Sequence, residues 1–291
     1  MKIVMKFGGT SVASGKNIHR IAKLIASYVN QGNQVVAVVS ALDGITEKLI
    51  EAAEQAERQN KDFISPFKQG LLDRHLKVAE EAISNTLILS EVQSIIADTV
   101  EELEKVLTGI VYVGELTYRS RDYILSFGER LSAPILYGAL KDAGLNSCFL
   151  TGAEAGIVTD DNFGEANPLM NVTRLQVKER LEALLKKGIV PVVTGFIAAT
   201  QDGVTTTLGR GGSDYTATII GAALDAEEVW IWTDVDGLMT ADPKIVPNAK
   251  TLPEISFKEA LEMAVFGAKA MHPRALEPII DGNTIVRIKN I

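Results

Sequence analysis

The feature that most constrains this chain is the alternation of short apolar segments with longer segments of helical periodicity. Apolar runs rich in β-branched residues predict buried strands, and apolar residues spaced three and four apart predict helices that cover a sheet. The expected strands lie at 3–7, 35–42, 189–196 and 228–234. The expected helices lie at about 17–30, 121–143, 173–187, 213–224 and 256–266. This order predicts an α/β fold, a three-layer αβα sandwich with a mostly parallel central sheet.

The segment between residues 45 and 108 interrupts this alternation. It is charged and helix-prone, and it carries no strand signal. We therefore expect a helical insertion near 45–108 within one domain that extends over residues 1–291.

Composition excludes several classes of function. Hydrophobic residues make up 46% of the 291 residues and the net charge is −8, which argues against nucleic acid or an anionic membrane as the main partner. The single cysteine, Cys148, excludes an internal disulfide, and CFL (148–150) predicts a buried strand with a core thiol. Because the sequence shows no long apolar segment and no signal peptide, we expect a cytoplasmic protein.

A glycine-rich loop, TLGRGGSD (207–214), precedes one of the expected helices. Its glycines allow the backbone to approach a ligand closely, and Ser213 is predicted to cap the helix that follows. A helix N-terminus with free N–H groups binds anions. The loop is therefore a candidate anion site.

Two charged side chains of this loop extend the prediction. Arg210 can bind a carboxylate through two hydrogen bonds, and Asp214 can accept an ammonium group. Together they would bind a zwitterion, that is, an amino acid. The alternative is a glycine-rich turn with a solvent-facing ion pair.

The N-terminal segment KIVMKFGGTSV predicts a strand, a glycine turn at Gly8 and Gly9, and a helix capped by Ser14. Lys6 precedes the turn and could hold a phosphate, although a solvated edge residue is the commoner role of lysine. GTSVASGK (9–16) has one residue too many for a Walker A loop, and no dinucleotide fingerprint follows the strand. The expected phosphate site is thus of another type.

Five motifs occur along the chain in a fixed order. They are KFGGTSV (6–12), SFGERLS (126–132), TTLGRGGSD (206–214), WTDVDG (232–237) and FGAKAMHPR (266–274). In this order they resemble the catalytic domain of aspartokinases, in the amino-acid kinase superfamily, over residues 2–290. The resemblance implies the amino-acid kinase fold, with a substrate half at about 1–200 and a nucleotide half at about 201–291. It also implies a homodimer or higher homo-oligomer, with the helical insertion contributing to the dimer surface.

The same resemblance implies roles for individual residues. Arg210 would bind the α-carboxylate of aspartate, and Asp214 and Glu129 would bind its α-ammonium. The other implied substrate contacts are Ser40, Thr46, Phe196 and Ser213. The implied ATP contacts are Lys6, Gly8, Gly9, Ser11, Thr233, Asp234, Met239, Lys244 and Lys269.

Two nucleotide positions depart from the family pattern. Met239 stands where the family often has Tyr, and Lys244 where it often has Arg. Methionine can pack against an adenine but donates no hydrogen bond, and lysine lacks the planar fork of arginine. We expect ATP binding to persist, and nucleotide affinity or selectivity is the property that these two departures bear on.

The implied reaction is ATP-dependent phosphorylation of the β-carboxylate of L-aspartate, the first step towards lysine, threonine and methionine. A carboxylate is ionised at neutral pH, so the attack requires no general base. Lys6, the amides of Gly8 and Gly9, and Asp214 are the candidate catalytic groups, with Mg²⁺ carried on ATP. We assign no direct metal ligand, because the three histidines lack metal-ligand spacing.

Aspartokinases commonly continue into ACT domains that bind lysine or threonine, and we expect none in these 291 residues. We therefore expect no feedback inhibition of this chain, whether it is a trimmed or a naturally short enzyme. The alternatives are a kinase of another acidic substrate such as glutamate, a non-catalytic nucleotide-binding regulatory subunit, and a nicotinamide-dependent dehydrogenase.

Overall fold

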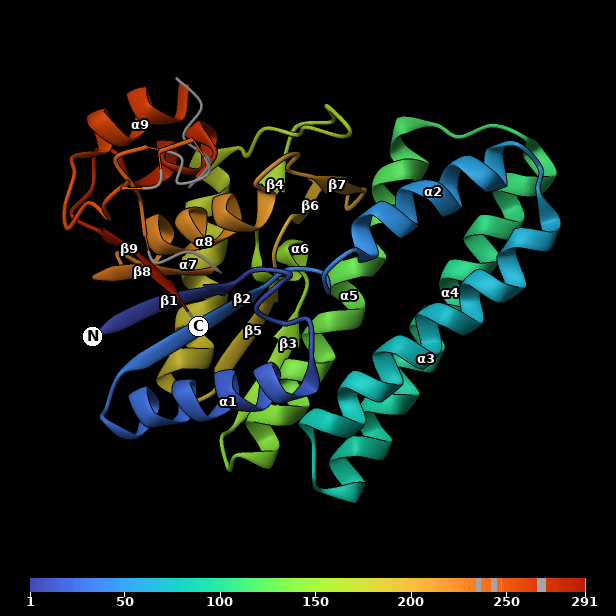
Figure 1. Ribbon diagram of the computed structural model, residues 1–291, viewed down its shortest axis with the longest axis horizontal. Helices are drawn as coiled ribbons and strands as arrows, with labels where there is room; N and C mark the ends of the chain where they lie inside the picture. The colour runs from blue at the N-terminus through green and yellow to red at the C-terminus, as the bar shows by residue number, and fades with distance from the viewer. Residues whose placement is uncertain (234–236, 242–244, 247, 266–270, 291) are drawn as a thin grey trace.

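A parallel sheet forms the centre of the molecule. The computed structural model describes residues 1–233, 237–241, 245–246, 248–265 and 271–290. Within these ranges, the strands of the central sheet are β1 (Lys2–Phe7), β2 (Gln34–Val39), β3 (Ser147–Leu150), β5 (Val190–Thr194), β8 (Glu228–Thr233) and β9 (Ile285–Asn290). They are all parallel, in the order β3-β5-β2-β1-β8-β9 (Figure 1). Each predicted strand is therefore present, although the one expected at 35–42 ends at Val39.

Helices cover both faces of this sheet. They are α1 (Gly15–Asn30) and α5 (Tyr118–Asp142) on one face, and α7 (Met170–Lys186) and α8 (Gly212–Ala223) on the other. Successive residues of a strand point to opposite faces, so Ile3 and Met5 join the first core and Val4 joins the second. The predicted three-layer sandwich is confirmed.

The alternation along β1 also places Lys6. This residue shares a face with Val4 and therefore points towards α8 rather than α1. The first helix begins as predicted, because the Ser14 side chain accepts a hydrogen bond from the backbone N–H of Asn17.

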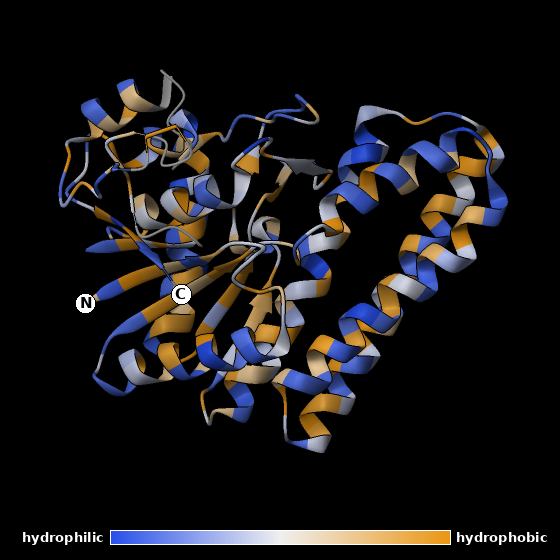
Figure 2. Cartoon of the chain, viewed as in Figure 1, coloured by the Kyte–Doolittle hydropathy of each residue, from blue (hydrophilic) through white to orange (hydrophobic). Residues whose placement is uncertain are grey.

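The expected helical insertion forms an arm beside the sheet (Figure 1). It contains α2 (Ile45–Glu57), the 3₁₀ helix η1 (Lys61–Phe63), α3 (Ile64–Ala82) and α4 (Thr86–Val113). Apolar and polar residues alternate around these helices (Figure 2), and their buried residues belong to the same hydrophobic cluster as Ile3 and Met5. The arm thus shares the core of the sandwich and ends at residue 113 rather than 108.

A small second sheet was not predicted. The short helix α6 (Gly152–Ala155) precedes β4 (Val158–Thr159), which pairs in parallel with β6 (Ile197–Thr200). Strand β6 then pairs antiparallel with β7 (Thr205–Thr207). This hairpin begins after Phe196, which has a φ of 67°, and it leads directly into the glycine-rich loop. The strand predicted at 189–196 therefore ends at Thr194.

The C-terminal part contains α9 (Phe257–Val265) and the 3₁₀ helices η2 (Pro273–Ala275) and η3 (Glu277–Ile279). His272 precedes η2, and Pro273 occupies the first position of this short helix. Cys148 lies in a strand as expected, but β3 is at the sheet edge, so this residue is half-buried rather than in the core. Burial still raises the pKa of its thiol. Across the described ranges, no helix is both long and apolar enough to cross a membrane.

Candidate active site

A lysine and an aspartate meet at the carboxyl end of β1. The Lys6 Nζ lies 2.6 Å from the Asp214 Oδ1, and both side chains are largely buried, at 12% and 15% exposure. Asp214 comes from the first turn of α8, where a carboxylate also interacts favourably with the helix dipole. Two motifs that are more than 200 residues apart therefore form one charged pair.

The Gly8–Gly9 turn lies directly beside this pair. A Cβ atom on Gly8 would be 3.5 Å from the Lys6 Nζ, and the Gly8 N–H donates to the carbonyl of Trp232. A Cβ atom on Gly9 would be 3.1 Å from the Ala41 carbonyl oxygen. The turn is thus enclosed by the end of β8 on one side and by the β2–α2 loop on the other.

Ser11 is placed at the same end of the sheet but is fully buried. Its hydroxyl is 3.4 Å from the carbonyl oxygen of Trp232 and donates to it. Ser11 therefore fastens the turn to β8.

Glu129 lies in the buried middle of α5, with 4% exposure. Its Oε1 accepts a 3.1 Å hydrogen bond from the Ala41 N–H, and its Oε2 has no partner among the described residues. Burial raises the pKa of this carboxyl from 4.5 to about 8. The unpaired oxygen is a buried acceptor that an incoming ammonium group would satisfy.

Two further substrate candidates, Ser40 and Thr46, lie on either side of the segment that Glu129 contacts at Ala41. The Ser132 hydroxyl, one turn along α5, donates a 2.7 Å hydrogen bond to the carbonyl of Ser40. Thr46 is half-buried in the first turn of α2, which follows this loop. Helix α5 therefore positions the β2–α2 loop beside the Gly8–Gly9 turn.

The titration of Glu129 yields a stability prediction. Between pH 5 and pH 8 the unfolded chain releases this proton while the folded, ligand-free chain retains it. The free energy of unfolding should therefore fall as the pH rises, by up to about 1.4 kcal/mol per pH unit from this group. Urea unfolding of wild type and Glu129→Gln between pH 5 and pH 8 tests this. As the pH rises, the free energy of unfolding of the variant should increase relative to that of wild type. Parallel pH profiles would contradict the assignment of the raised pKa.

The glycine-rich loop differs from the prediction at the start of its helix. Gly211, with a φ of 72°, is the N-cap residue, and α8 begins at Gly212. The prediction that Ser213 caps this helix is wrong, because the left-handed conformation at Gly211 starts the helix earlier. Ser213 instead packs against Gly195, where a Cβ atom would be 2.5 Å from the Ser213 Oγ.

Arg210 lies at the tip of this loop and is exposed. Among the described residues its side chain has no hydrogen-bond or ion-pair partner. Phe196 lies behind the loop, where its carbonyl accepts from the Leu208 N–H at 2.9 Å and its N–H donates to the Thr216 hydroxyl at 3.0 Å. The guanidinium is thus available for an anion on a loop whose base is fixed.

The nucleotide candidates are only partly described. Thr233 ends β8, and Met239 forms an antiparallel bridge with Thr251. Asp234, Lys244 and Lys269 lie outside the described residues.

Asp122 was not predicted, yet it is fully buried near the glycine-rich loop. Its carboxylate accepts from the N–H groups of Gly164 and Thr207, both at 2.9 Å, and from the Thr207 hydroxyl at 2.8 Å. Burial raises its pKa despite these hydrogen bonds. Asp122 directly follows the polar residues Arg119, Ser120 and Arg121, so the sequence around it gives no sign that this carboxylate is buried.

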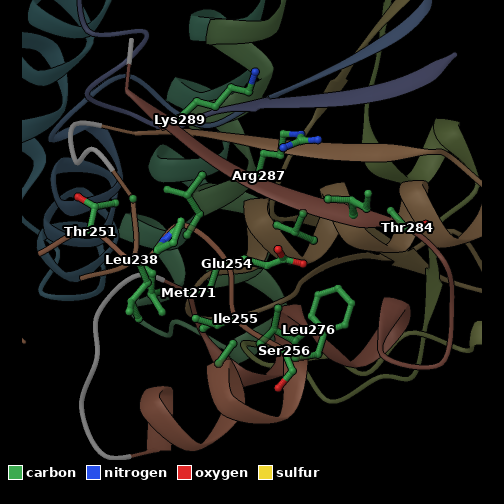
Figure 3. Close-up of a pocket in the computed structure, with 18 of the residues that line it drawn as sticks. Leu238, Thr251, Glu254, Ile255, Ser256, Met271, Leu276, Thr284, Arg287 and Lys289 are labelled. Carbon is green, nitrogen blue, oxygen red and sulfur yellow. The ribbon is translucent and has the colours of Figure 1, made fainter. Parts of the chain in front are cut away.

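A cavity lies away from these residues, beside β9 in the C-terminal part of the chain (Figure 3). Its volume is about 950 Å³, and Figure 3 shows Glu254, Arg287 and Lys289 on its walls. Both cations are engaged, because Arg287 makes two 2.8 Å bonds to Glu228 and the Lys289 Nζ lies 3.6 Å from the centre of the Trp230 ring. No described residue predicted for the site lines this cavity, so its size does not mark the active site.

The described residues provide no group of three or more His, Cys, Asp or Glu side chains that could hold a metal ion. The one predicted catalytic carboxylate among them, Asp214, is paired with Lys6. These residues do not fit a resident Mg²⁺ site, and Mg²⁺ would enter as part of the nucleotide substrate.

The chain is similar in sequence to a known family and to curated proteins. The sequence profile of the amino acid kinase family matches residues 1–290. Aspartokinase 3, chloroplastic, of Arabidopsis thaliana is 40% identical over 99% of this chain and 50% of its own length. The aspartokinase of Candida albicans is 33% identical over 99% of this chain and 54% of its own length.

A solved structure has a similar fold. Aspartokinase III of E. coli, in complex with aspartate and ADP, superposes with a TM-score of 0.90 at 31% identity. The match covers 100% of this chain and 62% of that one. The chain spans about half the length of the curated relatives it matches.

Proposed function

The chain belongs to the amino acid kinase family, and we propose that it is the catalytic domain of an aspartokinase that transfers the γ-phosphoryl group of MgATP to the β-carboxylate of L-aspartate. The similarity to aspartokinases supports this proposal. The observation that carries it is the meeting of Lys6 and Asp214 beside the Gly8–Gly9 turn.

Aspartate binding would use three charged groups. Arg210 binds the α-carboxylate with its exposed guanidinium, and the α-ammonium approaches the unpaired Glu129 Oε2 and Asp214. The ammonium favours the ionised form of Glu129 and so replaces its proton. Ser40, Thr46, Phe196 and Ser213 complete the proposed contacts.

Phosphoryl transfer then needs position and charge rather than a base. An oxygen of the β-carboxylate forms a bond to the γ-phosphorus, the bond from that phosphorus to the bridging oxygen breaks, and ADP leaves with the electron pair. Lys6 stabilises negative charge on the phosphoryl oxygens from beside the Gly8–Gly9 turn, since a Cβ atom on Gly8 would be 3.5 Å from its Nζ. Asp214 keeps that ammonium in place through the 2.6 Å ion pair.

The nucleotide contacts and the wider setting are proposed on similarity alone. Ser11, Thr233, Asp234, Met239, Lys244 and Lys269 are the proposed contacts besides Lys6, Gly8 and Gly9. The division into a substrate half and a nucleotide half, the homo-oligomer, the cytoplasmic location and the pathway towards lysine, threonine and methionine remain predictions.

A substrate panel tests the proposal. The purified chain is incubated with MgATP and hydroxylamine, with L-aspartate, L-glutamate or no acceptor, and both acyl hydroxamate and ADP are measured. We expect equal amounts of hydroxamate and ADP with aspartate and neither in its absence. Hydroxamate with glutamate alone would replace the substrate, and ATP binding without hydroxamate from any acid would indicate a non-catalytic regulatory protein.

A further inference from the structure

A second loop supports the glycine-rich loop that carries Arg210. It is the loop at residues 160–167, between β4 and α7, which lies beside the β6–β7 hairpin (Figure 1). The Ala166 N–H donates a 2.9 Å hydrogen bond to the Thr207 carbonyl. A Cβ atom on Gly209 would be 3.0 Å from the Glu165 Cγ and 3.3 Å from the Gly164 carbonyl oxygen. We call residues 160–167 the support loop, since the Gly209 backbone packs directly against it.

Arg274 holds the support loop from the side of the nucleotide half. Its Nη1 lies 3.1 Å from the Glu165 Oε1, and its Nη2 donates to the Ala166 carbonyl and to the Asn167 Oδ1, both at 3.0 Å. The Arg274 side chain is only 18% exposed. Three acceptors on three consecutive residues match the planar fork of a guanidinium, which a lysine ammonium cannot reproduce.

The same guanidinium also contacts the helix that follows the glycine-rich loop. It lies 5.3 Å from the centre of the Tyr215 ring, within the range of a cation–π interaction. Tyr215 is buried and directly follows Asp214. In addition, a Cβ atom on Gly211 would be 2.8 Å from the Cβ of His272, two residues before Arg274. The segment 272–274 therefore contacts the glycine-rich loop at Gly211 and the following helix at Tyr215.

We propose that Arg274 is a positioning residue for the amino-acid subsite, fixing the 209–214 loop through the support loop and Tyr215. This inference rests on the proposed function, because it assigns Arg274 to the binding of aspartate. Arg274 lies in the FGAKAMHPR motif, which also contains the proposed nucleotide contact Lys269. Through Arg274 the nucleotide half thus shapes the site of the other substrate.

Loss of the Arg274 guanidinium should change the KM for aspartate but not the KM for MgATP. Arg274→Lys keeps the charge but loses the fork, so Arg210 and Asp214 are held less well while the Gly8–Gly9 turn is untouched. We expect the KM for aspartate to rise about tenfold, the size expected for loss of about 1.4 kcal/mol, and the KM for MgATP to stay within about twofold. The matched control is Arg180→Lys, because Arg180 donates to the carbonyls of Ala153 and Glu154 and to Gln176 on a different surface.

A double-mutant cycle tests whether Arg274 acts through Arg210. Arg274 is proposed to act on aspartate binding through the 209–214 loop. Arg274→Lys should therefore raise the aspartate KM much less in an Arg210→Ala background than in wild type. An equal rise in both backgrounds, or an equal rise for Arg180→Lys, would overturn the proposal. So would a parallel rise in the MgATP KM, which would indicate a general loss of structure.

Hydrogen exchange tests the same contact without turnover. In Arg274→Lys, peptides that cover residues 160–167 and 207–213 should exchange faster than in wild type, whereas peptides of α1 and β2 should not. This holds even if the wild-type chain fails to phosphorylate aspartate, so failure of the proposed function and failure of this inference are distinguishable. Unchanged exchange in both loop peptides would overturn the proposal.

Discussion

Replacement of Lys6 by alanine should lower kcat about 100- to 1000-fold, the range for loss of one preorganised group that stabilises transition-state charge. The aspartate KM should change little, because this ammonium acts on the phosphoryl group rather than on the amino acid. The structure supports the assignment, since the Lys6 Nζ is held at 2.6 Å by Asp214 and lies beside the Gly8–Gly9 turn. Steady-state kinetics over both substrates provides the measurement.

Lys2→Ala is the matched control for this result. Lys2 lies on the same strand and also makes an ion pair, to Glu182 at 2.9 Å, but at the opposite end of β1. It should retain wild-type kcat. A Lys6→Ala protein that keeps its turnover and loses only aspartate affinity would contradict the catalytic role of Lys6.

Replacement of Arg210 by alanine should change the KM for aspartate rather than kcat. We expect the aspartate KM to rise about 10- to 100-fold, because two charge-assisted hydrogen bonds to the α-carboxylate are lost. The exposed guanidinium has no partner among the described side chains, so its removal should leave no group unpaired in the free protein. Thermal unfolding should therefore be nearly unchanged.

Two further variants sharpen the interpretation of Arg210. Arg210→Lys retains the charge without the planar guanidinium, so its KM for aspartate should lie between those of wild type and Arg210→Ala. Arg20→Ala removes an exposed arginine from α1 and should leave the aspartate KM unchanged. An unchanged aspartate KM in Arg210→Ala itself would remove this residue from the proposed subsite.

The parallel sheet was predictable because its signal is local. Strands such as β2, with five consecutive buried residues, stand out as apolar runs, and α1 shows its apolar stripe and its Ser14 cap in one short window. The small β4-β6-β7 sheet was missed because its strands have two to four residues and contain threonine. Such short polar strands depend on pairing partners that are distant in the sequence.

In the candidate site, the residues of local sequence motifs were predictable and the residues with distant partners were not. Lys6, Gly8, Gly9 and Asp214 were found from two glycine motifs, and the structure brings them together. Arg274 and Asp122 were not found as contributors, because their partners lie 107 and 85 residues away. The prediction that Ser213 caps α8 was also wrong because of a distant contact. Gly211, which starts the helix in a left-handed conformation, packs against His272 from a distant segment. The match to the amino acid kinase family argues against the alternative of a nicotinamide-dependent dehydrogenase.

The most direct test of the central claim is to locate the oxygen that receives the phosphoryl group. L-Aspartate labelled with ¹⁸O in its β-carboxylate is incubated with the chain and MgATP, and the acyl phosphate is observed by ³¹P NMR. We predict an acyl phosphate whose ³¹P resonance shows an ¹⁸O isotope shift with β-labelled aspartate and no shift with α-labelled aspartate. An isotope shift with the α-label, or no acyl phosphate from aspartate, would contradict the proposed phosphorylation of the β-carboxylate.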